Sequence, residues 1–307
     1  MKKARKPLFE PGSVYFGVTP TSWWNDDFLD IDIGIPYQQA FSEMALAGYE
    51  GCSQGHKYPE DLEVLKFELG LRGLRISEPW TSTFFTINKM RDKTIADFRA
   101  SLAFIKAMGG TDMVVAELGQ SSHQRPVDLV ANRPIFKDPE WESLADGLNE
   151  LGAIATAEGM RLCYHHHMGT GVMTLADVRR LMAMTNPGDV RLLLDTGHLT
   201  YAGDDPLECI AEFGHRLGHV HLKNIRRPAM EEALAQGMSF HDAIEHGVFT
   251  VPGDPAGCLD FEAILKALAA IPYKGWMVVE AEQNPAKANP LQYVKMARDY
   301  LREVTGL

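Results

Sequence analysis

The sequence predicts an α/β protein of the (β/α)₈ barrel class, in which a closed ring of parallel strands is surrounded by helices. About eight strand candidates alternate with helical segments along the 307 residues. Such alternation implies a parallel sheet, because parallel neighbours need crossover connections. The helix-to-strand turns are short and glycine-rich, whereas the strand-to-helix loops are long. No GxGxxG pattern follows the first strand, which disfavours a dinucleotide-binding sheet.

The elements follow from hydrophobic patterning and from turn residues. Glycines such as Gly48 and Gly73 end helical patterns, as is typical of helix C-termini. Strands are expected at residues 14–18, 50–53, 74–77, 112–117, 161–164, 190–194, 219–222 and 276–279. Helices are expected at residues 36–47, 59–71, 93–108, 140–157, 175–184, 206–213, 261–270 and 291–304.

Two strand-to-helix loops are long, at residues 119–139 and at about 223–260. In a barrel, such loops lie at the C-terminal face of the sheet, where active sites are found. The second loop carries a helical pattern at residues 229–238, and we expect this insertion to cover the site. No linker or low-complexity segment divides the chain, so residues 1–307 are expected to form a single domain.

Composition excludes several classes of partner. The formal charge is −11, from 41 acidic and 30 basic residues, which argues against nucleic acid. No run of about 18 apolar residues predicts a membrane span. The four cysteines form no CxxC pair and are expected to be buried free thiols in a reducing compartment. The basic residues 1–7 lead into no apolar segment, so we expect a cytoplasmic protein that acts on a small molecule.

Four successive strands end in residues that can bind a metal ion. His165, in the run His165-His166-His167, follows one strand, and Asp195, His221 and Glu280 end the next three. Neighbouring strands lie about 4.8 Å apart, so these groups can converge on one ion. A single such residue is more often structural, but four on consecutive strands favour a divalent metal centre.

Several segments resemble the xylose isomerase-like barrel superfamily, namely residues 195–198, 219–223, 251–254 and 279–280. More closely, the chain is similar to the inosose dehydratases of myo-inositol catabolism. Residues 17–27, 164–170, 249–254 and 279–287 carry this resemblance, which extends over almost the full length. It implies a metal-dependent hydro-lyase that removes water from 2-keto-myo-inositol and forms a trihydroxycyclohexane-1,2-dione. Manganese or cobalt is the expected ion, with zinc, iron or magnesium as alternatives, and the resemblance also implies glutathione as a candidate cofactor.

The chain departs from the superfamily at one proposed ligand. In the superfamily a glutamate usually ends the fifth strand and binds the metal, whereas His165 aligns there. Asp195, His221 and Glu280 match the later ligands, and His198 matches a histidine that binds a further ion in endonuclease-type members. The missing glutamate argues against a full multi-metal cluster.

The implied reaction requires groups that transfer protons. A divalent ion on the carbonyl oxygen would stabilise an enolate, while a base removes a carbon-bound proton and an acid protonates the leaving hydroxyl. The candidates are Lys223 and Glu282, each two residues beyond a predicted ligand on the same strand face, and His198. A lysine near a cation would have a lowered pKa and could act as the base. A salt-bridge or hydroxyl-binding role for Lys223 stays open.

Loop residues after the strands are candidates for substrate binding. Trp23, Trp24 and Trp80 are expected in loops, where they could form an aromatic wall against the ring or pack into the core. Polar candidates for the ring hydroxyls are Asn25, Asp26, Glu78, Glu117, His166 and His167.

Other functions stay open at this point. A sugar or inosose isomerase or epimerase would use the same ion and a similar enediol, although His165 in place of a carboxylate disfavours it. A non-catalytic sugar-binding barrel would bind without turnover. Phosphodiester hydrolysis is disfavoured by the acidic charge, and a homo-oligomer is an open alternative to a monomer.

Overall fold

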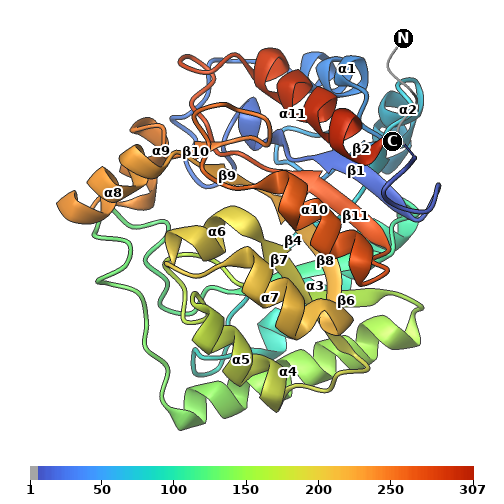
Figure 1. Cartoon of the computed structure of the whole chain (residues 1–307). Helices are drawn as coiled ribbons and strands as arrows, with labels where there is room; N and C mark the ends of the chain where they lie inside the picture. Colours follow the sequence, from blue (N-terminus) through green and yellow to red (C-terminus); the bar gives the residue numbers. More distant parts are fainter. Residues whose placement is uncertain (1–5) are drawn as a thin grey trace.

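The computed structural model describes residues 6–307 and shows a parallel sheet curled into an α/β barrel (Figure 1). In these residues, the barrel sheet has the strand order β3-β2-β1-β11-β8-β7-β6-β5-β4. The end strands β3 (Arg75–Ile76) and β4 (Trp80–Thr83) are separated only by residues 77–79. We therefore read them as two parts of one interrupted strand, through which the ring closes. The predicted fold class is confirmed.

The remaining strands of the ring all pair in parallel with their neighbours. They are β1 (Val14–Val18), β2 (Gly51–Cys52), β5 (Asp112–Glu117), β6 (Arg161–His165), β7 (Val190–Asp195), β8 (Leu217–Leu222) and β11 (Gly275–Val279). A separate antiparallel pair, β9 (Asn224–Ile225) and β10 (Phe249–Thr250), lies within the loop that follows β8.

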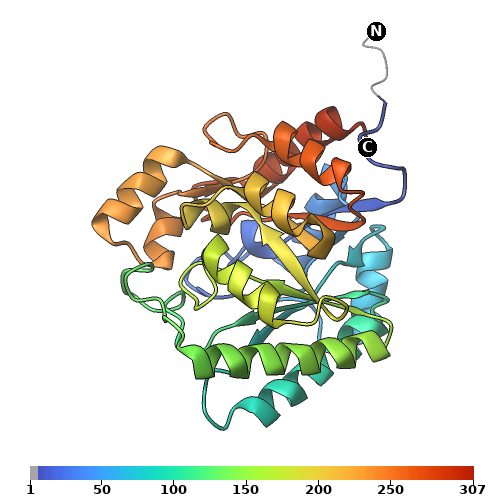
Figure 2. The ribbon, with the colours of Figure 1, turned by 60° about the horizontal axis from the view of Figure 1, so that its bottom comes forward.

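Figures 1 and 2 show most helices on the outside of the ring, whereas α8 and α9 project from one end. The helices are α1 (Tyr37–Ala47), α2 (Leu62–Gly70), α3 (Arg91–Ala107), α4 (Asp138–Ala157), α5 (Leu175–Met184), α6 (Thr196–Tyr201), α7 (Pro206–Phe213), α8 (Arg227–Gln236), α9 (Phe240–Glu245), α10 (Phe261–Ala270) and α11 (Pro290–Thr305). The patterning missed β4, α6 and α9, because each is too short to establish a period of its own.

Alternation along the strands separates two environments. Side chains such as Leu162, Leu192 and Val220 face the helices and join the main apolar core. The interior of the ring holds a small apolar cluster of Val114, Cys163 and Leu193, all buried. Toward the C-terminal ends of the strands the interior is lined by buried charged and polar groups, among them His165, Asp195 and His221.

A β-bulge at Gly218 sets which residues of β8 face the interior. The β7–β8 register steps from Leu192 opposite Leu217 to Leu193 opposite His219, so Gly218 is the extra residue. A slip of one residue reverses which side chains face each side of a strand. The bulge therefore turns His219 and His221 inward, and a Cβ at Gly218 would lie 2.7 Å from the Cys163 sulfur.

The insertion after β8 packs across the C-terminal end of the ring. Phe240 and Phe249 are buried in a second apolar cluster together with Ile31, Leu129 and Met168, which belong to three other loops at this end. The Phe240 ring lies 5.5 Å from the His167 ring and 6.2 Å from the His198 ring, centre to centre. Aromatic side chains of the insertion thus border the histidines of the site.

All four cysteines are free, and Cys52, Cys163 and Cys209 are buried while Cys258 is partly exposed. Within residues 6–307 no helix has both the length and the apolar character needed to cross a membrane. The expectation about the basic start of the chain concerns residues 1–7, of which 1–5 lie outside the described part of the structure.

Substitution of Gly51 by alanine is expected to destabilise the ring, because Gly51 has no room for a side chain. An added Cβ would lie 2.5 Å from the Arg75 carbonyl oxygen and 2.6 Å from the Trp276 ring. Overpacking of this kind costs about 1–3 kcal/mol of unfolding free energy, measurable by urea denaturation. Gly70→Ala is the control, since a Cβ there meets nothing within 4 Å and alanine favours helix. Equal stability of the two variants would contradict the close packing at β2.

Candidate active site

The C-terminal ends of β6, β7, β8 and β11 bring four predicted ligands together. His165, Asp195, His221 and Glu280 each offer one donor atom, and these atoms all lie within 4.8 Å of one another. Asp195 pairs directly with His221 across the β7–β8 ladder, and Glu280 follows β11 immediately. The four residues therefore lie together at the strand ends, and their role as metal ligands stays a prediction.

His165 is held in one tautomer by its own loop. Its Nδ1 donates a hydrogen bond to the carbonyl oxygen of His166, so Nε2 keeps a free lone pair. This Nε2 is buried and has no protein hydrogen-bond partner. Burial also lowers the pKa of His165 well below its ordinary value, helped by the neighbouring His221. His165 is therefore a neutral imidazole, the form that binds metals.

Asp195 has one oxygen engaged and one oxygen free. Its Oδ1 accepts the His198 backbone N–H at 2.7 Å and caps α6, while Oδ2 has no hydrogen-bond partner. That free oxygen lies 3.8 Å from His221 Nδ1. Burial raises the pKa of Asp195 to about 7, and the nearby Lys223 offsets this only in part. A fully buried carboxylate with an unpartnered oxygen requires a cation or a proton.

His221 lies between two carboxylates. Its Nδ1 is 2.7 Å from Glu280 Oε2, and its Nε2 is 3.3 Å from Glu78 Oε1. Burial would lower the pKa of His221, but Glu280 and Glu78 together outweigh it and raise the pKa to about 10. Burial would likewise raise the pKa of Glu280, yet Lys223 and His221 lower it.

The four residues fit a divalent cation. Protein ligands stand about 2.0–2.2 Å from a zinc-sized ion, so donor atoms of one coordination shell lie close together. His165 Nε2 and Asp195 Oδ2 are buried and have no hydrogen-bond partner, and one donor atom from each of the four residues lies within 4.8 Å of the others. A set of two imidazoles and two carboxylates matches the nitrogen and oxygen preference of Mn²⁺, Co²⁺, Fe²⁺ or Zn²⁺.

A second group next to these ligands already contains a cation, the ammonium of Lys223. Its Nζ lies 2.7 Å from His198 Nε2 and 2.8 Å from Glu282, with Glu280 at 3.4 Å. His167, His198 and Glu282 also lie close enough together to hold an ion. Because Lys223 supplies positive charge there, this second group is compensated without a metal.

The sequence predicts a lowered pKa for Lys223 next to a bound cation, and the protein groups alone act in the opposite direction. Burial alone would lower the pKa of Lys223, but Asp195, Glu280 and Glu282 surround it and raise the pKa above its ordinary value. The buried Lys223 is thus a stable ammonium. Burial raises the pKa of Glu282, while Lys223 acts in the opposite direction.

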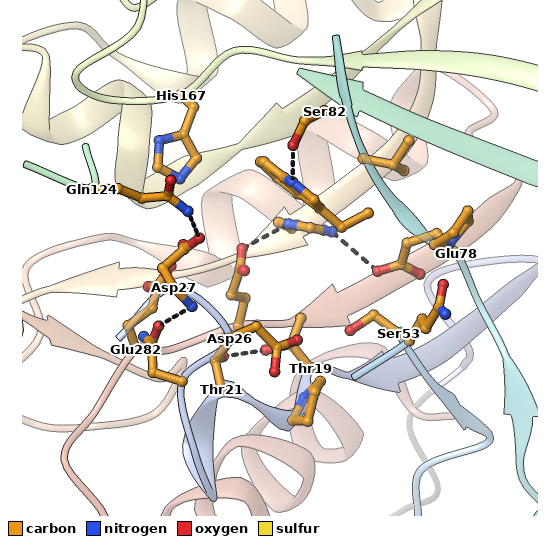
Figure 3. A pocket seen from close by; sticks show the side chains of 18 residues that line it. Thr19, Thr21, Asp26, Asp27, Ser53, Glu78, Ser82, Gln124, His167 and Glu282 are labelled. Carbon is orange, nitrogen blue, oxygen red and sulfur yellow. Dashed lines mark hydrogen bonds and ion pairs between the residues drawn. The ribbon is translucent and has the colours of Figure 1, made fainter. Parts of the chain in front are cut away.

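A cavity of about 290 Å³ opens beside the four ligands (Figure 3). His221 and Glu280 reach it from the ligand group, and Glu282 and His167 line it from the second group. Lys223 and His198 do not line it. The other residues that line the cavity are Thr19, Pro20, Thr21, Asn25, Asp26, Asp27, Ser53, Gln54, Glu78, Pro79, Trp80, Ser82, Val114 and Gln124.

Polar pairs brace the wall of the cavity. Gln124 donates to Asp27 at 2.6 Å, which joins the loop after β5 to the loop after β1 (Figure 3). Asp26 pairs with His56, and Asn25 accepts the backbone N–H groups of Asp27 and Phe28. The predicted substrate residues Asn25 and Asp26 are therefore at the cavity, held by their neighbours.

Trp23, Trp24 and His166 do not line the cavity. Trp24 is fully buried, and its indole N–H donates to Asp26 at 3.1 Å. Trp23 is fully buried, and its indole N–H donates to Glu43 on α1 at 2.6 Å, so it packs in the core. His166 is fully buried, and its Nε2 accepts the Asp195 backbone N–H at 3.2 Å. Trp80, which was expected in a loop, lies on β4 and lines the cavity.

Glu117 also has a structural role in place of the predicted substrate contact. Its two oxygens accept hydrogen bonds from Thr83 and Thr86 hydroxyls and from the backbone N–H groups of Phe85, Thr86 and Gly119. The carboxylate is fully buried and does not line the cavity. Glu117 therefore fixes the turn after β4.

Sequence reasoning missed several cavity residues. Ser53 and Gln54 follow β2, and the rule applied to the later strand ends would have marked them. Asp27 and Gln124 lie in long loops, where polar residues are common and carry no distinct signal. His219 was part of a recognised motif but received no role, although its Nε2 lies 3.3 Å from Glu78.

The fold and the site define the class of protein. The family model described as xylose isomerase-like TIM barrel matches residues 41–304. The chain therefore belongs to the xylose isomerase-like TIM barrel family.

Individual relatives are similar along the whole chain. The inosose dehydratase of Geobacillus thermodenitrificans is 45% identical over 301 residues, which are 98% of this chain and 100% of the relative. The inosose dehydratase of Clostridium beijerinckii is 45% identical over 294 residues, covering 95% of this chain and 98% of the relative.

Solved structures share the fold at low identity. The probable 3-DHS dehydratase AsbF from Bacillus anthracis superposes with a TM-score of 0.70 at 14% identity, covering 94% of this chain and 98% of its own. The IolI protein with a bound zinc atom gives a TM-score of 0.69 at 18% identity, covering 95% and 98%. At such identities these structures support the barrel alone.

Metal analysis tests the ligand assignment. We expect one divalent ion per chain in the wild type and loss of that ion in Asp195→Ala and Glu280→Ala, because each change removes a charged donor. Inductively coupled plasma mass spectrometry of the purified proteins measures this. Glu245→Gln, which changes a carboxylate paired with Lys287 outside the group, should keep the ion. Full occupancy in Asp195→Ala would refute that ligand.

Proposed function

We propose that this chain is a metal-dependent hydro-lyase that dehydrates 2-keto-myo-inositol to a trihydroxycyclohexane-1,2-dione. The main support for this proposal is the 45% identity to an inosose dehydratase along all of that relative's length. The geometry supports the assignment, since a polar cavity lies against a group of four candidate metal ligands. Fold alone would not choose between reactions.

The cavity suits a small polyhydroxylated ring. Its volume of about 290 Å³ is just below the range for small-ligand pockets, about 300–1,000 Å³. Hydroxyl, amide and carboxylate groups of Thr19, Ser53, Gln54 and Asp26 line one side. Trp80 offers an aromatic surface, which can pack against the apolar face of a ring.

The reaction requires removal of a proton next to the carbonyl and loss of a hydroxyl group from the next carbon. When bound to His165, Asp195, His221 and Glu280, a divalent ion would act as a Lewis acid toward the carbonyl oxygen. Glu282 reaches the cavity and can accept or donate a proton there. His167 donates from Nδ1 to the Met168 carbonyl at 2.8 Å, which leaves its Nε2 free to accept a hydrogen bond from a ring hydroxyl.

Lys223 and His198 act through Glu282 in this proposal. Lys223 holds the Glu282 carboxylate at 2.8 Å, and His198 accepts from the same ammonium. Neither lines the cavity. We therefore assign them as positioning residues and Glu282 as the group that exchanges the proton with substrate.

Manganese or cobalt is the proposed ion. Four protein ligands already complete the tetrahedral shell that zinc prefers in closed sites. A substrate that binds through its carbonyl oxygen needs further coordination positions, which six-coordinate ions provide. Return of activity when the chelated protein is titrated with each ion separates these metals, and assays with and without glutathione test the thiol cofactor.

The insertion at residues 223–260 is proposed to shield the site from water. Phe240 is fully buried beside His167 and His198, and Phe249 lies below the Lys223 ammonium at 5.6 Å. Apolar cover strengthens the charge interactions beneath it, because water no longer screens them.

Incubation with 2-keto-myo-inositol in deuterated water tests the reaction. We expect loss of one water molecule per ketone, seen by mass spectrometry, that depends on a divalent ion. Deuterium exchange next to the carbonyl without elimination would indicate an epimerase or isomerase instead. Binding without either reaction would indicate a sugar-binding barrel.

Glu282→Gln is expected to lower kcat about 10²–10⁴-fold, because an amide cannot transfer the proton. Bound metal should remain near the wild-type level, since Glu282 lies outside the proposed ligand group. Glu245→Gln, outside the cavity, should turn over at the wild-type rate. Wild-type kcat in Glu282→Gln would reject its role in proton transfer.

A further inference from the structure

A chain of buried charged groups runs through the interior of the ring below the proposed metal ligands. Both Asp112 oxygens bind Arg161, at 2.6 and 2.8 Å, and Asp112 Oδ2 lies 3.4 Å from His219 Nδ1. The other ring nitrogen of His219 is 3.3 Å from Glu78 Oε2. The second oxygen of Glu78 is 3.3 Å from His221 Nε2. Glu78 is thus the last carboxylate before a proposed ligand.

The orientation of the His221 ring determines what the contact between His221 and Glu78 can do. Nδ1 faces the ligand side, because it lies 2.7 Å from Glu280 and 3.8 Å from the free oxygen of Asp195. An ion bound at Nδ1 requires the ring proton to be on Nε2. That N–H then points at Glu78, and a carboxylate partner on the distal nitrogen fixes the orientation of a metal-binding imidazole.

The surroundings of Glu78 keep it in this place. Glu78 lies in the gap between β3 and β4, where the interrupted strand lets its side chain enter the ring. It is 2% exposed, and each oxygen faces one imidazole. His219 itself faces inward only because of the bulge at Gly218. The bulge in β8 and the interruption between β3 and β4 thus bring His219 and the Glu78 carboxylate next to each other inside the ring.

We propose that Glu78 is a positioning residue that orients His221 for metal binding, and that it does not bind the substrate ring. The proposal rests on the metal site put forward above and extends it to a residue outside the four ligands. Glu78 touches the cavity wall, on the side opposite His167 and Gln124 (Figure 3). Its Oε1 already contacts His221 at 3.3 Å, and this contact, not a substrate contact, is the basis of the proposal.

Glu78→Gln tests the proposal through metal affinity, measured by titration of the chelated protein with Co²⁺ and with Mn²⁺ in the absence of substrate. Loss of the carboxylate partner should weaken binding about 10–100-fold, as for other distal partners of metal-binding histidines. Ser82→Ala is the matched control. Ser82 lines the same cavity and accepts only the Trp80 indole N–H among the described side chains, so metal affinity should be unchanged.

A second variant covers the case in which Glu78→Gln does not fold. His219→Gln removes the imidazole that lies 3.3 Å from Glu78 but leaves Glu78 and all four ligands in place. It should weaken metal binding by a smaller factor, because it acts through Glu78. A circular dichroism melt of each chelated protein identifies a variant that has lost its fold.

The outcomes of these experiments distinguish a failure of the positioning role of Glu78 from a failure of the proposed metal site. Weaker metal binding in Glu78→Gln, with KM for the ketone unchanged at saturating metal, supports the positioning role. Wild-type metal affinity with a raised KM means that Glu78 binds substrate and overturns the role. If Glu78→Gln is unfolded, wild-type affinity in His219→Gln overturns it. A wild-type protein that binds neither ion would overturn the metal site itself.

Discussion

The charges buried at the C-terminal end of the barrel must neutralise one another, and this requirement constrains which side chains can surround them. An isolated charge in this environment is costly, so every carboxylate there needs a cation or a hydrogen-bond donor. Lys223 provides one such cation and lies within 3.6 Å of Asp195, Glu280 and Glu282. Its stem fits only because Gly197 has no side chain, as a Cβ there would lie 2.4 Å from the Lys223 Cγ. Asp195 Oδ2 lies 3.6 Å from this ammonium but has no hydrogen-bond partner, so it can still take up one further positive charge.

The position of Lys223 divides the site into two halves, which differ in whether their negative charge is already neutralised by the protein. One half, around His165 and Asp195, has buried lone pairs without partners and suits an external cation. The other half, around Lys223, already contains its cation and presents Glu282 to the cavity. A site proposed for electrophilic activation therefore lies next to a site proposed for proton exchange. The fold supplies both because successive parallel strands end side by side.

Much of this arrangement could be predicted from the sequence, and the failures have physical causes. Parallel alternation and the strand-end rule located Asp195, His221 and Glu280. Which of three consecutive histidines faces inward depends on register, and only His165 and His167 do so, while His166 supports the Asp195 backbone. The ionisation of Lys223 depends on three carboxylates from other strands. Glu117 is satisfied by a turn about 30 residues earlier in the chain, a contact that no local pattern encodes.

The strands of the ring differ in length, so we expect the two sides of the ring to differ in local stability. β7 and β8 are six residues long, whereas β2 and β3 have two residues each. Short ladders open more readily than long ones, because local stability follows the number of cooperating backbone hydrogen bonds. The four candidate ligands lie at the ends of the longer strands β6, β7, β8 and β11. Ser53 and Gln54 line the cavity after the short strand β2, so we expect the backbone there to open more readily than the backbone that carries the candidate ligands.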